Sequence, residues 1–578
     1  MFAFTTRTRM KESIIGILTL MLLRHGSAQD PTVDIPGLGS VVGATDLSYV
    51  NERPFSMFLN VPFATPPVGP TFRFKAAAPV QPWSGVWNAT FEGNRCPQVT
   101  VDRNNTNNTF DYTKASVTED CLYLKIYTPT PVEGANLPVV VFLHGGAYVT
   151  GSKVLYDGHK FMDYDVVLVV PNYRLGPFGF LSLDTDDIPG NAGLIDQAMA
   201  IQWVKDYISS FGGDPNRITV MGHSAGGNGA SLHNISPLSS NLFQQLIIQS
   251  GAASAIWGLD YNNIYAATEI GNLYGCPELD IQGLTTCFLN ADVLQLLRAQ
   301  SDFQSNELAA GRNIFSGASP VIQKAGSVIF LDRDPREILQ SGNHTAHRML
   351  LGSNKHEGTL PFSYIHNGYL VKNGLLDNQE YMQREYTNFI LHYLRFQDQG
   401  ESIAAMTEKS HFGQSNMGNY TAMTSGIVDY LGNGFFKGPV YEDAMYNYAI
   451  ADTYLYAFHY LGDRSLFYLF ADPNAIDGGV CHGNELLLQF NIPGPPLTIR
   501  DRRMSRTLME LWTNFIIYSN PTPPANPVDD VPNWPLFNGS TRSGKYMIIN
   551  ENCTVQSDHT LNEYFLAETE GFPYLTDP

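Results

Sequence analysis

The stretch ITVMGHSAGG, residues Ile218 to Gly227, joins an apolar strand pattern to a turn of small residues. Its second half fits the pattern G-x-S-x-G, with Ser224 between Gly222 and Gly226. After a buried strand, this pattern predicts a sharp turn that exposes the serine hydroxyl as a nucleophile, and the two glycines relieve the crowding. A plain glycine-rich turn is the alternative, since so short a pattern often arises by chance. The preceding strand favours the nucleophile.

Apolar strand patterns and helical patterns alternate along the chain. Continuous β-branched runs of this kind predict a large, mainly parallel central sheet with helices on both faces, which is an α/β fold class. We find no repeat and no long linker, so residues 29–578 are expected to form a single domain. The predicted strands are 123–128, 137–144, 166–171, 217–222, 245–251, 348–354 and 453–460, and the clearest helical patterns are 193–211 and 378–396.

A serine nucleophile needs donors that hold the negative oxygen formed on the substrate. The stretch FLHGGAY places Gly145 and Gly146 just past the strand 137–144. Their backbone N–H groups, together with that of Ala225, are candidates for an oxyanion hole. A simple turn is the other interpretation of the two glycines.

The first 28 residues differ from the rest in composition. Basic residues precede the apolar run at 14–23, and small residues follow it, which is typical of a secretory signal peptide cut after Ala28. Ten apolar residues are too few for the roughly 20 that span a bilayer. We therefore expect a secreted, extracellular protein with no stable membrane anchor. Removal of the signal peptide takes away Arg7, Arg9, Lys11, Arg24 and Glu12, which changes the formal charge from -20 to -23.

This acidic charge argues against nucleic acid or an anionic membrane as a partner. Six cysteines lie in the mature part, and none shows the paired C-x-x-C spacing of a zinc site, so no metal is expected. An exported chain is expected to carry glycans at some of its Asn-x-Ser/Thr acceptor patterns. These patterns occur at Asn88, Asn104, Asn107, Asn234, Asn343, Asn419, Asn538 and Asn552.

The order of several longer motifs carries a family resemblance. From about residue 30 to about 570, the chain resembles the type-B carboxylesterase and cholinesterase family of α/β hydrolases, which implies the α/β-hydrolase fold. Beyond the two motifs above, the resemblance rests on TEDCLYLKIYTP (118–129), NYRLGPFGFLS (172–182), GNAGLIDQ (190–197), FGGDPNRITVMGHSAGG (211–227) and IIQSGA (247–252).

The resemblance also implies the remaining catalytic residues. In GGVCHGNELLLQF, His482 aligns with the family's histidine-glycine-x-glutamate segment, which makes it the expected general base and acid. In LLGSNKHEGTLPF, Glu357 lies where the family has its triad glutamate. Ser250 matches a buried supporting serine, although an ordinary hydroxyl at a strand end is as good an interpretation. Asp196 and Asp214 lie in structural motifs of the family.

The cysteines follow the same resemblance. It implies disulfides between Cys96 and Cys121 and between Cys276 and Cys287, each worth roughly 3 kcal/mol. Cys481 and Cys553 do not match the family's third loop. They either pair with one another or remain free.

The resemblance implies a serine hydrolase that cleaves small carboxylic esters through an acyl-enzyme, with no cofactor, and the pattern at 1–28 adds the expectation of secretion. Two features argue against acetylcholine as the substrate. His223 replaces the Glu that precedes the serine in choline-ester hydrolases, and the segment between Cys96 and Cys121 has no Trp to bind a quaternary ammonium. The alternatives are a catalytically silent adhesion or binding protein on the same fold, and a lipase or thioesterase. His223 itself is either a specificity residue or a packed neighbour of the turn.

Overall fold

A computed structural model describes residues 30–101, 110–312, 316–395, 401–467, 476–540, 544–570 and 572. The expected signal peptide at 1–28 lies outside the described residues, as do the acceptor residues Asn104 and Asn107.

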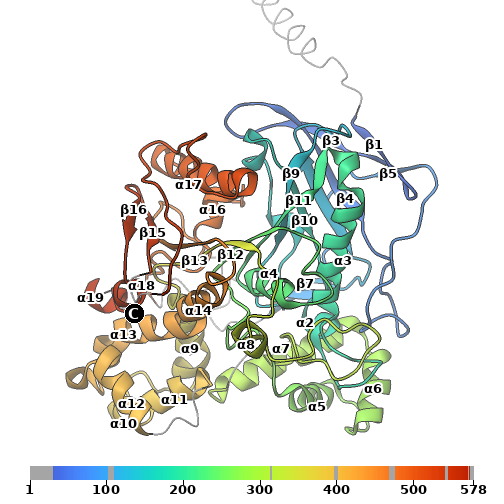
Figure 1. Ribbon diagram of the computed structural model, residues 1–578. Helices are drawn as coiled ribbons and strands as arrows, with labels where there is room; N and C mark the ends of the chain where they lie inside the picture. Colours follow the sequence, from blue (N-terminus) through green and yellow to red (C-terminus); the bar gives the residue numbers. More distant parts are fainter. Residues whose placement is uncertain are drawn as a thin grey trace, which may run out of the picture.

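A large sheet forms the centre of the molecule. Its strands are β3 (Ala44–Leu47), β4 (Pro54–Pro62), β8 (Tyr123–Thr128), β9 (Leu137–Leu143), β10 (Val167–Pro171), β11 (Gly213–His223), β12 (Gln245–Gln249), β13 (Arg348–Asn354), β14 (Thr453–Phe458), β15 (Tyr546–Ile549) and β16 (Thr554–Gln556). They form an 11-stranded sheet in the order β16-β15-β14-β13-β12-β11-β9-β10-β8-β4-β3 (Figure 1). Two small sheets stand apart: β1 (Thr32–Ile35), β2 (Gly39–Val42) and β5 (Val86–Asn88) form one, and β6 (Gln98–Val101) and β7 (Phe110–Ser116) form the other.

The sheet is parallel in its centre and antiparallel at both edges. All neighbouring pairs from β10 through β9, β11, β12, β13 and β14 to β15 are parallel. Strand β8 runs antiparallel to β10 and to β4, and β16 runs antiparallel to β15. The expected parallel sheet is therefore the central part of a mixed one.

Successive side chains of the central strands point to opposite faces of the sheet, so a core forms on each face. In β10, Leu168 and Val170 join one buried cluster, whereas Val167 and Val169 join another. Since each fully buried aliphatic side chain contributes roughly 1.5–3 kcal/mol, both faces favour burial under helices. The covering helices are α3 (Ala192–Tyr207), α4 (Ala225–Ile235), α14 (Gly438–Asn447) and α17 (Ile499–Tyr518).

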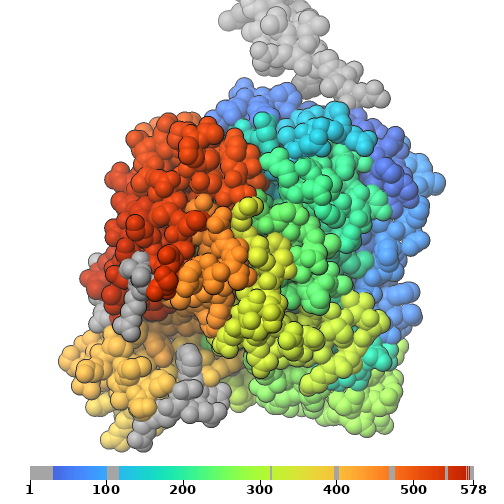
Figure 2. Space-filling view, viewed as in Figure 1, coloured from blue at the N-terminus to red at the C-terminus, as the bar shows by residue number. Residues whose placement is uncertain are grey.

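Further helices surround this core, and those between residues 263 and 432 gather on the lower side of the view in Figure 1. The predicted helix at 378–396 forms two helices, α10 (Gln379–Arg384) and α11 (Tyr386–Tyr393), which are interrupted at Glu385, where φ is -113°. In chain order, the remaining helices are α2 (Gly176–Phe180), α5 (Asn263–Tyr274), α6 (Ile281–Leu289), α7 (Val293–Ala309), α8 (Pro335–Gln340), α9 (Thr359–Ile365), α10 (Gln379–Arg384), α11 (Tyr386–Tyr393), α12 (Glu401–Thr407), α13 (Tyr420–Gly432), α16 (Leu486–Gln489), α18 (His559–Glu563) and α19 (Leu566–Glu570). Figure 2 shows blue N-terminal and red C-terminal segments at opposite sides of one face.

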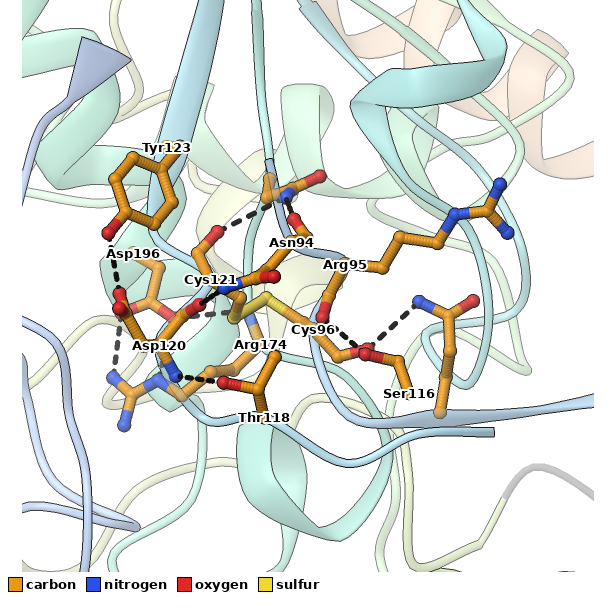
Figure 3. Close-up of a disulfide and its surroundings, with 12 residues drawn as sticks. Asn94, Arg95, Cys96, Ser116, Thr118, Asp120, Cys121, Tyr123, Arg174 and Asp196 are labelled. Carbon is orange, nitrogen blue, oxygen red and sulfur yellow. Dashed lines mark hydrogen bonds and ion pairs between the residues drawn. A yellow bond between two sulfur atoms is a disulfide. The ribbon is translucent and has the colours of Figure 1, made fainter. Parts of the chain in front are cut away.

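Two disulfides are present, and they join the pairs that the family resemblance implies. Cys96 bonds Cys121, and Cys276 bonds Cys287. Around the first, the side chain of Asn94 donates to the carbonyl oxygen of Asp120 (3.0 Å), so the segments on both sides of the bond are also joined by a hydrogen bond (Figure 3). Cys481 and Cys553 are free and buried, and hence do not pair.

The acceptor asparagines differ in exposure. Asn234 is only 1 % exposed, within α4, and its Oδ1 lies 2.7 Å from Nδ1 of His347. A bulky glycan has no room beside so buried a side chain, so this burial argues against glycosylation at Asn234. The side chains at the other five described acceptor positions are exposed: Asn88, Asn343, Asn419, Asn538 and Asn552.

In the parts of the chain that the structure describes, no helix combines the length and apolar character needed to cross a membrane.

Candidate active site

Ser224 occupies the strained turn between β11 and α4. Its φ of 57° and ψ of -125° are unusual for a residue with a side chain, and such strain concentrates at functional sites. The flanking glycines are required by close approach of the backbone. A Cβ on Gly222 would lie 2.0 Å from the carbonyl oxygen of Gly226, and one on Gly226 would lie 2.0 Å from that of Leu143. The sequence motif therefore forms the predicted tight elbow.

His482 and Glu357 meet at the carboxyl edge of the parallel strands. Glu357 follows β13, and His482 lies in the segment between β14 and α16. Nδ1 of His482 lies 2.6 Å from Oε2 of Glu357. The glutamate is 0 % exposed and the histidine 5 % exposed. A buried carboxylate at this distance fixes the orientation of an imidazole and stabilises its protonated form.

The second carboxylate oxygen of Glu357 is held by two donors. The hydroxyl of Ser250 and the backbone N–H of Asn354 (2.7 Å) both donate to Oε1. Ser250 thus lies where the resemblance places a supporting serine. These bonds leave Oε2 directed at His482, so the carboxylate has little freedom to turn.

The ring of His482 lies against two other rings. Its centroid lies 4.6 Å from that of His223 and 4.3 Å from that of Phe436. Its Nε2 is buried and makes no hydrogen bond to any described residue, so Ser224 and His482 are not hydrogen-bonded here. In unliganded enzymes the bond between nucleophile and base is often long and tightens only with substrate. The free Nε2 is the atom that a general base needs.

Gly145 lies directly against the elbow. A Cβ on Gly145 would lie 2.9 Å from Cβ of Ser224 and 2.7 Å from the carbonyl oxygen of His223. Ala225 is the first residue of α4, where backbone N–H groups have no partner inside the helix. Among the described residues, the backbone N–H groups of Gly146 and Ala225 donate to no backbone acceptor, whereas the backbone of Gly145 hydrogen-bonds the hydroxyl of Tyr156. The N–H groups of Gly146 and Ala225 are available to a substrate oxygen.

A second buried pair, His223 and Glu485, lies behind the first. Nε2 of His223 lies 4.0 Å from Oε1 of Glu485, which is 0 % exposed. Burial, and then the charge of Glu357, raises the pKa of Glu485 to about 7. Burial, and then His482, holds the pKa of His223 well below its usual value, so His223 is neutral. The motif around His482 contained Glu485, but only the fold reveals this contact.

Asn354 links the two carboxylates. Its backbone N–H donates to Glu357, and its side-chain Nδ2 donates to Oε2 of Glu485 (2.5 Å). Gln249 donates to the other oxygen of Glu485 (3.1 Å). His223 therefore lies against His482 on one hand and beside the held carboxylate of Glu485 on the other.

Asp196 and Asp214, which the resemblance assigns to structural motifs, make other contacts than those of the site. Asp196 forms a buried ion pair with Arg174, with Oδ1 2.6 Å and Oδ2 2.7 Å from guanidinium nitrogens (Figure 3). Asp214 accepts a hydrogen bond from the backbone of Asn216 (2.8 Å). Within the described ranges, no group of three or more His, Cys, Asp or Glu side chains is arranged to hold a metal ion.

Comparison with known proteins gives the family. A family model described as "Carboxylesterase family" matches residues 29–566. A juvenile hormone esterase of Tribolium castaneum is 34% identical over 516 residues, covering 84% of each chain. Esterase FE4 of Myzus persicae is 32% identical, covering 88% of each, and a human cocaine esterase is 30% identical, covering 92% of this chain and 91% of the human one. The chain therefore belongs to the carboxylesterase family and is a carboxylic ester hydrolase.

Proposed function

We propose that this chain is a secreted serine esterase in which Ser224 is the nucleophile, His482 the general base and acid, and Glu357 the orienting carboxylate. The observation that carries this proposal is the buried contact of 2.6 Å between His482 Nδ1 and Glu357 Oε2. Because Nδ1 is occupied by this contact, Nε2 of the same imidazole is free to accept the proton of a nucleophile.

The reaction proceeds in two halves. Nε2 of His482 takes the proton of the Ser224 hydroxyl while Oγ attacks the ester carbonyl carbon. The resulting oxyanion accepts hydrogen bonds from the backbone N–H groups of Gly145, Gly146 and Ala225. His482 then gives the proton to the departing alkoxide, and an alcohol leaves the acyl-enzyme. Water, deprotonated by His482, attacks the acyl carbon. His482 then returns that proton to Oγ of Ser224 as the carboxylic acid leaves.

The proposed substrates are small carboxylic esters. The relatives' names include juvenile hormone esterase, cocaine esterase and Esterase FE4, and the first two name different molecules. The neutral His223 beside the elbow offers no negative charge to a quaternary ammonium, which disfavours choline esters. The pattern at residues 1–28 supports export from the cell.

Acyl-chain profiling of the purified protein tests this proposal. Hydrolysis of p-nitrophenyl esters from acetate to palmitate is measured for wild type and for Ser224→Ala. We expect turnover of short and medium esters by wild type, and loss of that turnover by about 10³-fold or more in the variant. Activity confined to long acyl chains would instead assign a lipase. Equal activity of the two proteins would exclude Ser224 as the nucleophile.

A further inference from the structure

His356, the neighbour of Glu357, joins the two segments that carry the acid and the base. Its backbone N–H donates to the carbonyl oxygen of Val480 (3.0 Å), and the backbone N–H of Val480 donates back to Nδ1 of the His356 ring (3.1 Å). Val480 precedes His482 by two residues. This reciprocal pair fixes the segment around Glu357 to the segment around His482, so it bears on the distance between the two catalytic side chains.

A residue near the C-terminus covers this bridge. The ring of Phe572 stacks on that of His356, with centroids 4.0 Å apart and planes inclined by 17°. The backbone of Gly479 packs closely against both rings. A Cβ on this glycine would lie 2.4 Å from the Phe572 ring and 2.5 Å from Nδ1 of His356, so a side chain at this position would separate the three segments. Three parts of the chain that are distant in sequence thus meet beside the triad.

The C-terminal segment is itself anchored. We call residues 559–570 and 572 the C-terminal strap. The backbone N–H of Ala567 donates to Oδ1 of Asp429 (3.1 Å), and Lys437 donates to the carbonyl oxygen of Glu563 (2.6 Å). The backbone N–H of Phe572 donates to Ala567 (2.8 Å). These bonds attach the strap to α13 and to the segment before α14, which lie beside α18 and α19 in Figure 1 and adjoin the red segments in Figure 2.

The state of the His356 ring is defined by its contacts. Because Val480 donates to Nδ1, this nitrogen carries no proton, and burial lowers the pKa of His356 to about 4, so the ring is neutral. Its Nε2–H then faces Oε2 of Glu570, 3.6 Å away. Glu570 also pairs with Lys355, the residue before His356. The strap therefore contacts this imidazole on one face and at one edge.

We propose that Phe572 is a positioning residue for the catalytic triad. By stacking on His356 it holds the bridge to Val480, and the bridge keeps Glu357 within 2.6 Å of His482. A shift of a catalytic group by about 1 Å lowers a rate by up to about 10²-fold, so a small relaxation of the bridge has a measurable effect. This inference rests on the proposed function, because it takes Glu357 and His482 to act as acid and base.

The test uses the full chain with Phe572→Ala. Rates are expressed per Ser224 reacted with an organophosphate, so that unfolded protein does not count. We expect kcat to fall about tenfold or more, with KM changed by less than about twofold, because the loss lies in the transition state.

Matched controls separate positioning from general destabilisation. Leu561, in the same strap, is 73% exposed, and Leu561→Ala leaves kcat and KM unchanged. In His356→Leu, which lacks both the stacking ring and the acceptor, a further Phe572→Ala changes kcat by less than about twofold, because the effect passes through His356. Additive losses of kcat in the double variant would contradict this route.

Hydrogen exchange gives a readout that does not depend on catalysis. The amide of Val480 is protected by its bond to His356, and Phe572→Ala is expected to raise exchange in the peptide 478–485, whereas Leu561→Ala is not. An unchanged kcat per labelled serine, or unchanged exchange, in Phe572→Ala overturns the role of the strap. Ser224→Ala is assayed in parallel. If it keeps wild-type activity, the proposed function fails, whereas an inactive Ser224→Ala beside an unaffected Phe572→Ala removes only the strap proposal.

Discussion

His482 and Glu357, which are separated by 125 residues in sequence, are joined by a contact of 2.6 Å, and both side chains are buried. The parallel strands bring their segments to one edge of the sheet, and Ser250 and Asn354 hold the other carboxylate oxygen. The orientation of the base is thus set by groups that no local sequence pattern connects.

Replacement of Glu357 by Gln is expected to lower kcat by about 10³- to 10⁴-fold, because an amide neither stabilises the imidazolium nor selects the tautomer. Steady-state kinetics on a short acyl ester provide the measurement. Ser250→Ala removes only one bond to the carboxylate and should lose much less. A Glu357→Gln variant with kcat within about tenfold of wild type would show that Glu357 is not the orienting acid.

Gly145→Ala is expected to lower kcat by about 10²-fold, the usual loss when one oxyanion donor is misplaced. The added Cβ would lie 2.7 Å from the carbonyl oxygen of His223 and 2.9 Å from Cβ of Ser224, so the backbone must move. Gly134→Asn is the control, because the space around Gly134 is open and Asn tolerates its positive φ. Equal kcat in both variants would argue against a donor at 145.

Glu485 predicts a dependence of stability on pH. Its pKa in the folded chain, about 7, exceeds its ordinary value of 4.5, so the folded state binds the extra proton between these values. Wild type therefore loses stability as the pH rises from about 4.5 through 7, by up to roughly 3 kcal/mol. Glu485→Gln cannot ionise and should lack this loss.

Chemical denaturation of wild type and Glu485→Gln at pH 5 and pH 8.5 measures the effect. We expect the difference in unfolding free energy to shift in favour of the variant at the higher pH. A difference that is the same at both pH values would mean that Glu485 does not titrate in this range.

The disulfide between Cys96 and Cys121 closes a loop with a sequence separation of 25. Its removal in the double variant Cys96→Ser, Cys121→Ser is expected to reduce the free energy of unfolding by about 3 kcal/mol, since the unfolded chain gains freedom. Denaturant titration under non-reducing conditions gives the value. Cys553→Ser is the comparison because this thiol is free, and a loss as large as that of the double variant would point to packing instead of the cross-link.

Much of this architecture could be predicted from the sequence, for reasons that are local. The apolar runs of β8 and β13 coincide with the predicted strands, and the G-x-S-x-G pattern forms an elbow because glycine alone fits the close contacts at 222 and 226. Glu357 and His482 came from a family resemblance, since no period or spacing joins residues that far apart. The direction of the edge strands could not be predicted, because an apolar run such as that of β8 is the same in a parallel and in an antiparallel pair.

The missed features all depend on tertiary contacts. Glu485 and His356 look like ordinary polar residues in the sequence, and their importance follows only from burial beside His223 and Val480. The acceptor pattern at Asn234 carries no sign that α4 buries it. The break at Glu385 shows the same limit, because an apolar pattern that continues across it gives no signal of the interruption.

The most direct test of the central claim is the covalent labelling of Ser224. The purified protein is treated with a fluorophosphonate and digested, and the modified peptide is sequenced by mass spectrometry. We expect one stoichiometric adduct on Ser224, formed in parallel with the loss of ester hydrolysis, and none in Ser224→Ala. Labelling at another residue, or full ester hydrolysis by protein without Ser224, would contradict the account.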